Sequence, residues 1–509
     1  MKGAVAGGSQ LTVDAGMHAL AIGGNAIDAA IASTLMAGVA EPILSGLGGA
    51  GVATIRFDGS TQTCDFFANM PGLGCPDAPA AAMEQVSVDY GPTTQDFLVG
   101  PGATTVPGVP AGLCAMHDRY GTIDMIDLAV PAIEAARQGF RANRSFARVC
   151  ELLWNIVGRT EESRNLFAPH GHRLREGELF RCPDLANTIE QFAIDGDAYF
   201  RGGIGMERFL EQVEGKSRIS ELDFEAYRPT FRDAVPAKYR DAILWVPGPP
   251  SAAGIGVAHT LVQLEAGEIT DAATDLPMLR RMQRALGSTV SMRTQEFFEE
   301  LFRDDFGPLF MARVQAMRDG GNRTGPSPGF TTHISTADEQ GNAVAITHSL
   351  GETAGEVVGE TGIILNNFLG ESDVNPPFLR RPAGARLITM CCPSILETSD
   401  GRVVAMGSGG SSRIPTAVVH GAMYIVDHDW TVDAAVRGPR THVEAGKLHV
   451  ESAGRNEGTM AEATEVWPDF VRFDGPNLYF GGLHAAGFGP DGFCGAGDER
   501  RSGAFGVLE

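Results

Sequence analysis

The sequence predicts a layered α/β fold in which helices flank β-sheets. Residues 1–330 are rich in helical patterns, whereas residues 331–509 are rich in strand patterns. Strand patterns also occur in the N-terminal part, for example from Val52 to Phe57, so strands stand on both sides of the junction. Strands that are flanked by helices in this way are typical of layered α/β architectures. The junction between the two parts lies at Thr331.

Composition narrows the class of protein. The chain has 509 residues, 43% of them hydrophobic and 20% charged, which indicates a large globular core rather than disorder. Its net charge is -23 and it has no block of lysine or arginine, so we expect no nucleic-acid partner. It also has no uninterrupted apolar run of about 18 residues, so we expect no membrane span. The start at Met1 lacks a secretory signal pattern, which favours a cytoplasmic location.

Cysteine and histidine spacing gives no metal pattern. Eight cysteines are scattered without a C-x-x-C pair, and no H-E-x-x-H motif occurs. Cys391 and Cys392 lie together in an apolar run, where we expect packed thiols. We expect neither a metal nor another cofactor.

The N-terminal elements follow from local signals. Residues 10–22 carry a helical pattern that stops at two glycines, and Asn25 can cap a second helix that ends before Glu41-Pro42. A glycine-rich loop, residues 45–51, then leads into the strand that begins at Val52. A phosphate-binding loop needs the reverse order, strand before loop and helix after it. We therefore interpret this loop as a closely packed backbone turn.

The middle of the chain is mainly helical. A Pro/Gly loop at residues 100–112 leads into a helix near Leu113, and amphipathic helical patterns dominate residues 121–235. A strand is expected at residues 244–246, followed by helices to about Arg318. Residues 319–329 read as an accessible linker directly before Thr331.

A predicted β-hairpin begins with two threonines. Thr331, His333 and Ser335 alternate onto one face, and Gln340-Gly341-Asn342 supplies the turn before a returning strand from Ala343 to Thr347. If the bond before Thr331 is cut, the freed α-amine lies beside the hydroxyl and can act as its base. The alternative is that the threonines are ordinary β-branched strand residues, and that His333 only packs in the sheet.

A second glycine-rich loop, residues 407–415, lies between a predicted strand from Arg402 to Met406 and a helix near 412–426. Successive N–H groups at a strand-to-helix junction can hold an anion or an oxyanion. An ordinary turn is the alternative interpretation.

Taken together, the segments resemble the gamma-glutamyltranspeptidase family over nearly the whole chain. The matching segments, in order, are Gly23 to Ala30, Glu41-Pro42, Ser45 to Gly49, Val106-Pro107-Gly108, Pro249-Pro250-Ser251, Thr331-Thr332-His333, Gly341 to Val344, Leu365-Asn366-Asn367 and Gly410 to Ile414. Each is weak alone, but their common order is specific.

The resemblance implies a four-layer αββα N-terminal-nucleophile (Ntn) hydrolase made as a precursor. Cleavage between Phe330 and Thr331 would give a large fragment, 1–330, and a small fragment, 331–509, intertwined as one structural unit. Thr331 would then be the nucleophile, and its α-amine, with a reference pKa near 7.7, the base. Ser349 takes the place of a threonine that bonds the nucleophile. The N–H groups of Gly410 and Ser411 would be the oxyanion donors.

The acyl-binding positions depart from the family pattern. The segment that carries the family's glutamate-binding arginine reads Asp65 to Pro71 here and contains no arginine. Four further positions of the family's substrate-binding set carry different residues here. Of the family residues that hold the amino group of the substrate, only an acid remains. The expected substrate-binding positions are Gly351, Phe368, Glu371, Thr389 and Met390. Loss of the arginine removes a bidentate carboxylate contact.

Three functions compete at this point. The first is a self-processing amide hydrolase or acyltransferase that uses Thr331 on a small-molecule amide or gamma-glutamyl-like substrate with a non-standard acyl group. The second is a true glutathione hydrolase or gamma-glutamyltransferase, with a carboxylate clamp supplied by Arg380, Arg381 or Arg386. The third is an unprocessed, non-catalytic binding protein. For Arg440 and His442, which follow Gly438-Pro439, we expect a role as a brace between the two fragments rather than in catalysis.

Overall fold

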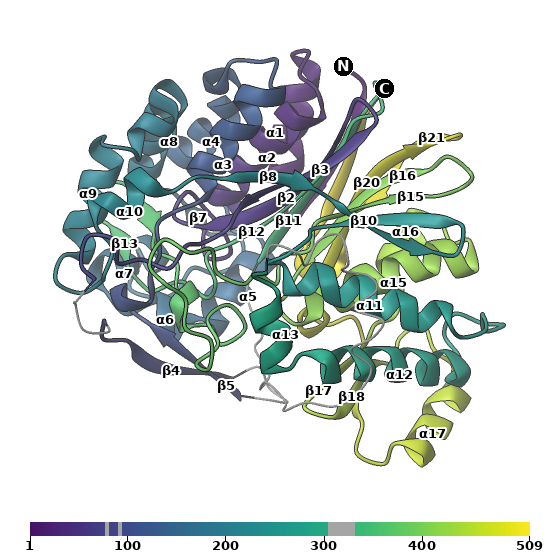
Figure 1. The fold of residues 1–509 in the computed structure, drawn as a ribbon. Coiled ribbons are helices and arrows are strands. Elements are labelled where there is room, and N and C mark those ends of the chain that lie inside the picture. The colour runs from purple at the N-terminus through teal and green to yellow at the C-terminus, as the bar shows by residue number, and fades with distance from the viewer. Residues whose placement is uncertain (77–80, 90–93, 304–330) are drawn as a thin grey trace.

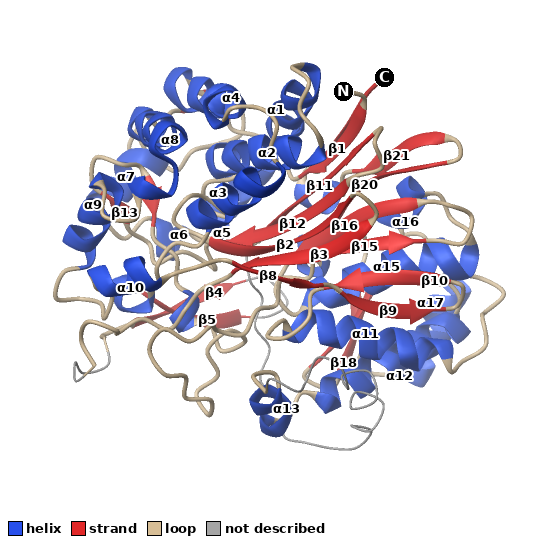
Figure 2. Ribbon diagram, turned by 45° about the horizontal axis from the view of Figure 1, so that its top comes forward, coloured by secondary structure: helices blue, strands red, loops and turns tan. Residues whose placement is uncertain are grey.

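A computed structural model describes residues 1–76, 81–89, 94–303 and 331–509. The expected linker at 319–329, the end of the helical stretch near Arg318 and the cleavage residue Phe330 lie outside the described residues. The rest of the chain folds into two stacked antiparallel sheets between two helical layers (Figures 1 and 2).

The larger sheet combines the two ends of the chain with the predicted hairpin. Strand β1 pairs with β22 on one side and with β11 on the other, so both termini lie at the same edge of the molecule (Figure 1). All pairings in this sheet are antiparallel. In spatial order its strands are β22 (Ala504–Leu508), β1 (Gly3–Gly7), β11 (Thr332–Asp338), β12 (Ala343–Ser349), β2 (Ala50–Phe57), β3 (Ser60–Phe66) and β8 (Thr230–Asp233).

The smaller sheet lies face to face with the larger one, with β16 and β20 against β11. Its strands are β21 (Gly492–Ala496), β20 (Gly482–Gly489), β16 (Val403–Gly409), β15 (Ser394–Glu397), β10 (Ala242–Val246) and β9 (Val235–Tyr239). Shorter sheets decorate the periphery: β4 (Glu84–Asp89) with β5 (Thr94–Val99), β6 (Phe140–Arg141) with β7 (Leu179–Phe180), β13 (Val357–Val358) with β14 (Ile363–Ile364), and β17 (Thr441–Glu444), β18 (Lys447–Glu451) and β19 (Val471–Phe473).

Helices cover the outer face of each sheet, which confirms the four-layer αββα arrangement (Figure 2). Helices α1 (Gln10–Ala21), α2 (Ala26–Ala40) and α3 (Val109–Tyr120) contact the larger sheet, while α4 (Met125–Gln138) packs on α1 and α2, and α8 (Pro183–Asp195) packs on α4. Helices α11 (Ala252–Glu265), α15 (Arg413–His428) and α16 (Val432–Arg437) contact the smaller sheet, while α12 (Leu276–Met292) packs on α11 and β17. The remaining helices are α5 (Arg144–Leu152), α6 (Trp154–Val157), α7 (Glu161–Phe167), α9 (Ile204–Val213), α10 (Glu221–Ala226), α13 (Gln295–Glu300) and α17 (Glu457–Val466).

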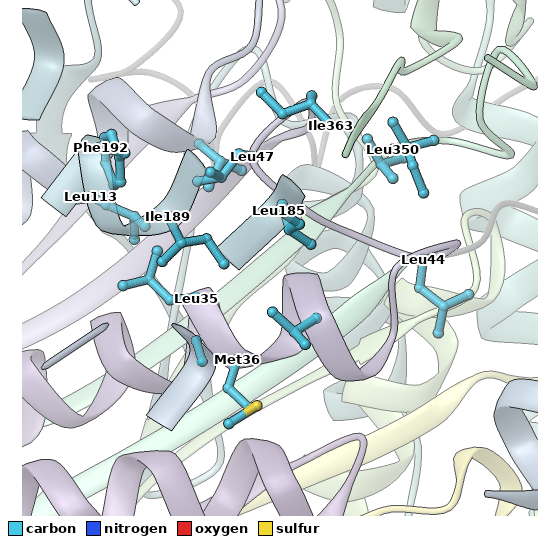
Figure 3. Close-up of a cluster of buried hydrophobic side chains, with 14 of the residues drawn as sticks. Leu35, Met36, Leu44, Leu47, Leu113, Leu185, Ile189, Phe192, Leu350 and Ile363 are labelled. Carbon is cyan, nitrogen blue, oxygen red and sulfur yellow. The ribbon is translucent and has the colours of Figure 1, made fainter. Parts of the chain in front are cut away.

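Helix α2 is the central helix of its layer. The Asn25 side chain accepts hydrogen bonds from the N–H groups of Ile27 and Asp28, and Asp28 accepts one from the Asn25 N–H, which completes a capping box. Every residue of α2 is buried, and its alanines let neighbouring layers approach closely. Leucine, isoleucine and phenylalanine side chains from the surrounding helices fill the space around Leu35 and Met36 (Figure 3). The predicted cap and helix are both confirmed.

Small side chains separate the two sheets. Alanines of β11, β12 and β16 pack together with Ile395 and Val403. On the same face, the His333 ring bonds to Thr347 Oγ1 and Ser335 Oγ, and Ser335 donates to the backbone oxygen of His484 in β20. His333 is thus a sheet-packing residue, as the alternative interpretation expected. Burial lowers the pKa of its imidazole well below the usual value.

Some strands did not stand out in the sequence. Strand β3 follows the Asp58-Gly59 turn, and it pairs with β2 along its whole length. The ribbon of β4 and β5 has only short apolar alternations, Val86 with Val88 and Phe97 with Val99. Among the helices that the structure describes, none has the length and apolar character needed to cross a membrane.

Candidate functional site

Thr331 lies at the end of the hairpin, immediately before β11 begins. Its side chain is buried, at 5% exposure, and its Oγ1 donates to Ser349 Oγ at 3.4 Å, which is a long hydrogen bond. Ser349 is the last residue of β12 and also accepts a 2.8 Å bond from the N–H of Gly351. The structure therefore brings the two predicted hydroxyl groups together across adjacent strands.

The backbone of Thr331 is fixed from the opposite side. Arg501 Nη1 donates to the carbonyl oxygen of Thr331 at 3.1 Å. Gly409, at the end of β16, packs so closely against this carbonyl that a Cβ there would overlap it. Arg501 lies in the short segment after β21 and is only 6% exposed. The sequence had not indicated this contact with Thr331.

The predicted oxyanion loop follows directly after Gly409. Gly410 has a φ of 119° and Ser411 a φ of 45°, so the loop turns sharply before α15 begins at Arg413. Among the described residues, no hydrogen bond uses the N–H of Gly410 or of Ser411. Two free N–H groups ahead of a 16-residue helix form a site that favours a negatively charged oxygen.

Two residues that sequence reasoning missed support this loop. The Ser411 hydroxyl donates to Asp373 Oδ2 at 3.0 Å, and Asp373 forms an ion pair with Arg293 at 3.3 Å. Burial raises the pKa of Asp373, and the neighbouring guanidinium of Arg293 opposes the shift. These residues come from separate parts of the chain, so only the tertiary fold reveals their contact.

Glu371, the acid expected in the acyl pocket, lies against Gly351, whose N–H donates to Ser349. Gly351 has a φ of 71°, and a Cβ on it would overlap both Glu371 Oε1 and Asn367 Oδ1. Glu371 is 6% exposed, and among the described residues its Oε1 has no hydrogen-bond partner. Burial, together with the charge of Asp373, raises the pKa of Glu371 to about 8.

The other expected acyl-pocket residues are mainly apolar in their surroundings. The Phe368 ring lies 4.9 Å from that of Phe67, centroid to centroid, in a cluster with Leu387 and Cys391. Met390 Sδ lies 3.6 Å from Arg293 Nη2. The hydroxyl oxygen Oγ1 of Thr389 accepts a 3.0 Å hydrogen bond from the N–H of Cys391, two residues further along the same segment.

Two of the three arginines considered as a carboxylate clamp, Arg381 and Arg386, have other contacts. Arg386 donates to the carbonyl oxygen of Phe67 and, at 2.8 Å, to that of Arg228. Its Nε lies 3.5 Å from Asp65 Oδ2, and its guanidinium stacks on the Tyr227 ring at 5.2 Å. Arg381 lies over the Phe302 ring at 3.5 Å. Arg386 therefore braces the Asp65 segment.

A second carboxyl group lies behind the nucleophile strand. Thr332 Oγ1 donates to Glu41 Oε2 at 2.8 Å, and Thr12 Oγ1 donates to Glu41 Oε1 at 3.2 Å. Burial raises the pKa of Glu41 to about 7, although these hydrogen bonds and the charge of Arg501 oppose the shift. In the sequence, Glu41 had indicated only the end of a helix.

The remaining predicted residues have structural contacts. Asn366 Nδ2 donates to the carbonyl oxygens of Gly48 and Thr105, so it holds the glycine-rich loop 45–51 in place. A Cβ on Gly48 would overlap the backbone of Ile364, which agrees with a closely packed turn. Arg440 is 1% exposed and forms an ion pair with Asp498 at 3.2 Å. Both residues lie within 331–509, so Arg440 braces this part of the chain, whereas we had expected a brace that joins it to residues 1–330.

A hollow of about 680 Å³, which includes space open to solvent, borders the loop that carries Ser411. Its wall contains Ser412, Asp373, Arg293 and Met390, together with residues of α11, α12, α15 and β17; Thr331 is not part of it. The wall of the hollow therefore combines apolar and charged side chains.

Stacked antiparallel sheets between helical layers, with a buried threonine immediately before strand β11, define an Ntn-type amidohydrolase fold. The gamma-glutamyltranspeptidase family model matches residues 12–508. The chain belongs to the gamma-glutamyltranspeptidase family, and it is an enzyme of the N-terminal-nucleophile hydrolase class.

Its relatives include both acylases and glutathione hydrolases. The acylase ACY 1 proenzyme of Pseudomonas sp. (strain V22) is 28% identical, over 96% of this chain and 90% of that protein. The glutathione hydrolase proenzyme of Escherichia coli (strain K12) is also 28% identical, over 87% of this chain and 81% of that protein. The fold is similar to a solved cephalosporin acylase from Bacillus halodurans, with a TM-score of 0.82 at 22% identity, over 100% of this chain and 96% of that one.

Proposed function

We propose that the protein is a self-processing amide hydrolase or acyltransferase that uses Thr331 as its nucleophile on a non-standard acyl donor. The observation that carries this proposal is the placement of the buried Thr331. Its hydroxyl donates to Ser349, and its carbonyl packs against Gly409, directly before the Gly410–Ser411 pair. Both relatives named above are called proenzymes, which supports a precursor that is cut. Cleavage between Phe330 and Thr331 gives fragments 1–330 and 331–509.

The reaction proceeds through an acyl-enzyme. The Thr331 oxygen attacks the amide carbonyl carbon of the substrate, and its proton passes to the freed α-amine of the same residue. The N–H groups of Gly410 and Ser411 stabilise the oxyanion, and Ser349 orients the attacking oxygen. The C–N bond then breaks, and the α-amine returns the proton to the departing nitrogen. Water or an amine adds to the resulting ester by the same proton transfers, which releases the acyl product and restores Thr331.

The acyl group differs from a gamma-glutamyl group. An α-carboxylate would need a cationic partner, but the corresponding segment contains Phe67, and Arg386 is engaged with backbone oxygens and Asp65. Phe67, Phe368 and Met390 instead favour an acyl chain with apolar methylene groups. Glutathione hydrolysis is therefore the less favoured alternative, although a relative carries that name.

The two fragments form one heterodimeric unit with a small-molecule amide as substrate. Strand β1 belongs to the large fragment, and both of its neighbours, β11 and β22, belong to the small fragment. The fragments therefore share one continuous sheet.

Intact mass and N-terminal sequencing of the purified protein test the proposal. We expect two fragments, the smaller beginning at Thr331. Thr331→Ala should leave one uncut chain, whereas Thr332→Ser, which keeps a hydroxyl for Glu41, should still be cut. A wild-type chain that stays whole, or a fragment that begins elsewhere, would rule out Thr331 as the nucleophile.

A further inference from the structure

The carboxyl group of Glu371 has an environment that does not suit a negative charge. The side chain is 6% exposed, and no described residue forms an ion pair with it. The charged group that acts on it, Asp373, is itself acidic, and the guanidinium of Arg293 is already paired with Asp373. A buried carboxyl group without a cation is stabilised by keeping its proton.

A neutral carboxyl group has chemistry that a carboxylate lacks. It can donate one hydrogen bond through its O–H, whereas the ionised form can only accept. Because it carries no charge, it also gains little from contact with an ammonium group. The protonation state of Glu371 therefore decides which end group of an acyl chain this pocket prefers.

The position of Glu371 places this donor one residue away from Ser349, across Gly351. Gly351 lies between Ser349, to which its N–H donates, and Glu371 Oε1, which occupies the space that a Cβ on Gly351 would need. Ser349 in turn accepts from Thr331. The second nearby oxygen, Asn367 Oδ1, already accepts from the N–H of Glu352.

We propose that Glu371 donates a hydrogen bond to a neutral acceptor oxygen on the acyl chain, and that the enzyme selects acyl groups with such an oxygen over zwitterionic amino-acid acyl groups. This inference rests on the proposed function, because it assigns the acyl specificity of the Thr331 site. The substrate class is an amide whose acyl chain has methylene groups against Phe67 and Phe368 and a carbonyl or ether oxygen further along the chain.

The specificity depends on pH. The titratable groups that face Glu371 are Asp373, on the same segment, and Cys391. Arg293, which follows α12, lies beyond Asp373 and is paired with it. The pKa of Glu371 is raised to about 8, so its proton is retained at neutral pH and lost in mild alkali. Burial also raises the pKa of the Cys391 thiol, to about 12, so that group stays neutral through this range.

A matched pair of substrates tests the inference. The 5-oxohexanoyl and hexanoyl p-nitroanilides differ by one carbonyl oxygen, and gamma-glutamyl-p-nitroanilide adds the zwitterionic end. At pH 6.5 we expect wild-type enzyme to favour the oxo compound over the hexanoyl compound by about tenfold in kcat/KM, the effect of one hydrogen bond. The preference should fall towards unity above pH 9. Gamma-glutamyl-p-nitroanilide should be the poorest of the three substrates.

Three variants separate the possible roles of Glu371. Glu371→Gln keeps a neutral donor of similar shape, so the oxo preference should persist and lose its dependence on pH. Glu371→Leu should hydrolyse the hexanoyl compound but show no oxo preference at any pH. Gly351→Ala should reduce the turnover of both compounds, because its Cβ overlaps Glu371 Oε1.

The outcomes also separate this inference from the proposed function. Hexanoyl turnover with no oxo preference in wild type, or an oxo preference that survives in Glu371→Leu, overturns the role of Glu371 and leaves Thr331 chemistry intact. A gamma-glutamyl preference that Glu371→Gln abolishes overturns it as well, since that pattern requires an ionised clamp. A chain that is uncut and hydrolyses none of the three compounds overturns the proposed function itself.

Discussion

The ring of His333 lies in the space that Gly407 leaves open on the facing sheet. A Cβ at Gly407 would overlap the imidazole, which is held by Thr347 and Ser335 in a completely buried position. This contact sets how closely β16 approaches β11, and thus how closely the Gly409–Ser411 loop approaches Thr331.

Gly407→Ala should therefore destabilise the protein and slow its self-cleavage. We expect a loss of about 1–3 kcal/mol in the free energy of unfolding, typical of an overpacked core. Urea denaturation and the rate of fragment formation measure the two effects. Gly287→Ala in α12 is the matched control, because its nearest neighbour, Gln283 Nε2, is 4.0 Å away and alanine favours a helix. A Gly407→Ala protein as stable as this control would contradict the packing role of Gly407.

Arg501→Met should slow acyl transfer without preventing folding. The substitution keeps much of the side-chain volume but removes the 3.1 Å bond to the carbonyl of Thr331. The first residue of the small fragment then has a less fixed backbone, and we expect kcat to fall about tenfold with little change in KM. The exposed Arg437→Met on α16 serves as a control that should behave like wild type. Unchanged kcat in Arg501→Met would show that this bond does not position the nucleophile.

Glu41 makes stability depend on pH in an unusual direction. Its folded pKa is raised to about 7 from a reference value of 4.5, so the folded state favours the protonated form. Its contribution is complete below about pH 4.5 and is lost as pH rises through 7. Glu41→Gln, which stays neutral, should therefore gain about 2–3 kcal/mol relative to wild type between pH 5 and pH 8.5. Denaturant titrations at the two pH values measure this gain. An equal difference at both would show that Glu41 ionises normally.

Arg386→Lys should weaken the fold but leave acyl specificity unchanged. Lysine keeps the positive charge near Asp65, but it loses the fork that reaches the carbonyls of Phe67 and Arg228. We expect a loss of about 1–3 kcal/mol in unfolding free energy. The ratio of kcat/KM for the gamma-glutamyl and hexanoyl p-nitroanilides should stay the same. A selective loss of the gamma-glutamyl reaction would instead identify Arg386 as a substrate clamp.

Local signals were sufficient to predict many elements of the fold. The Asn25 cap, the helix at Ala26–Ala40 and the hairpin turn at Gly341 depend on neighbours a few residues away, and all three are confirmed. The four-layer arrangement and the pairing of Thr331 with Ser349 followed from family resemblance, because periodicity alone does not specify which sheets stack.

The support around the nucleophile could not be predicted in this way. Arg501 is 170 residues from Thr331 in sequence, and Arg293 is 80 residues from Asp373. No local pattern connects such pairs, since their contact depends on the packing of whole layers. The pKa values of Glu41 and Glu371 share this origin, because burial by distant segments causes both shifts.

Strand β1 threads between β11 and β22, and this has a mechanical consequence for a chain cut before Thr331. The large piece inserts a strand into the middle of a sheet whose flanking strands belong to the small piece. Pulling the pieces apart would break two ladders of backbone hydrogen bonds at once and expose alanine-lined interior to water. Backbone cleavage should thus free a reactive terminus while the body of the molecule stays locked, so that maturation changes reactivity without dismantling the fold.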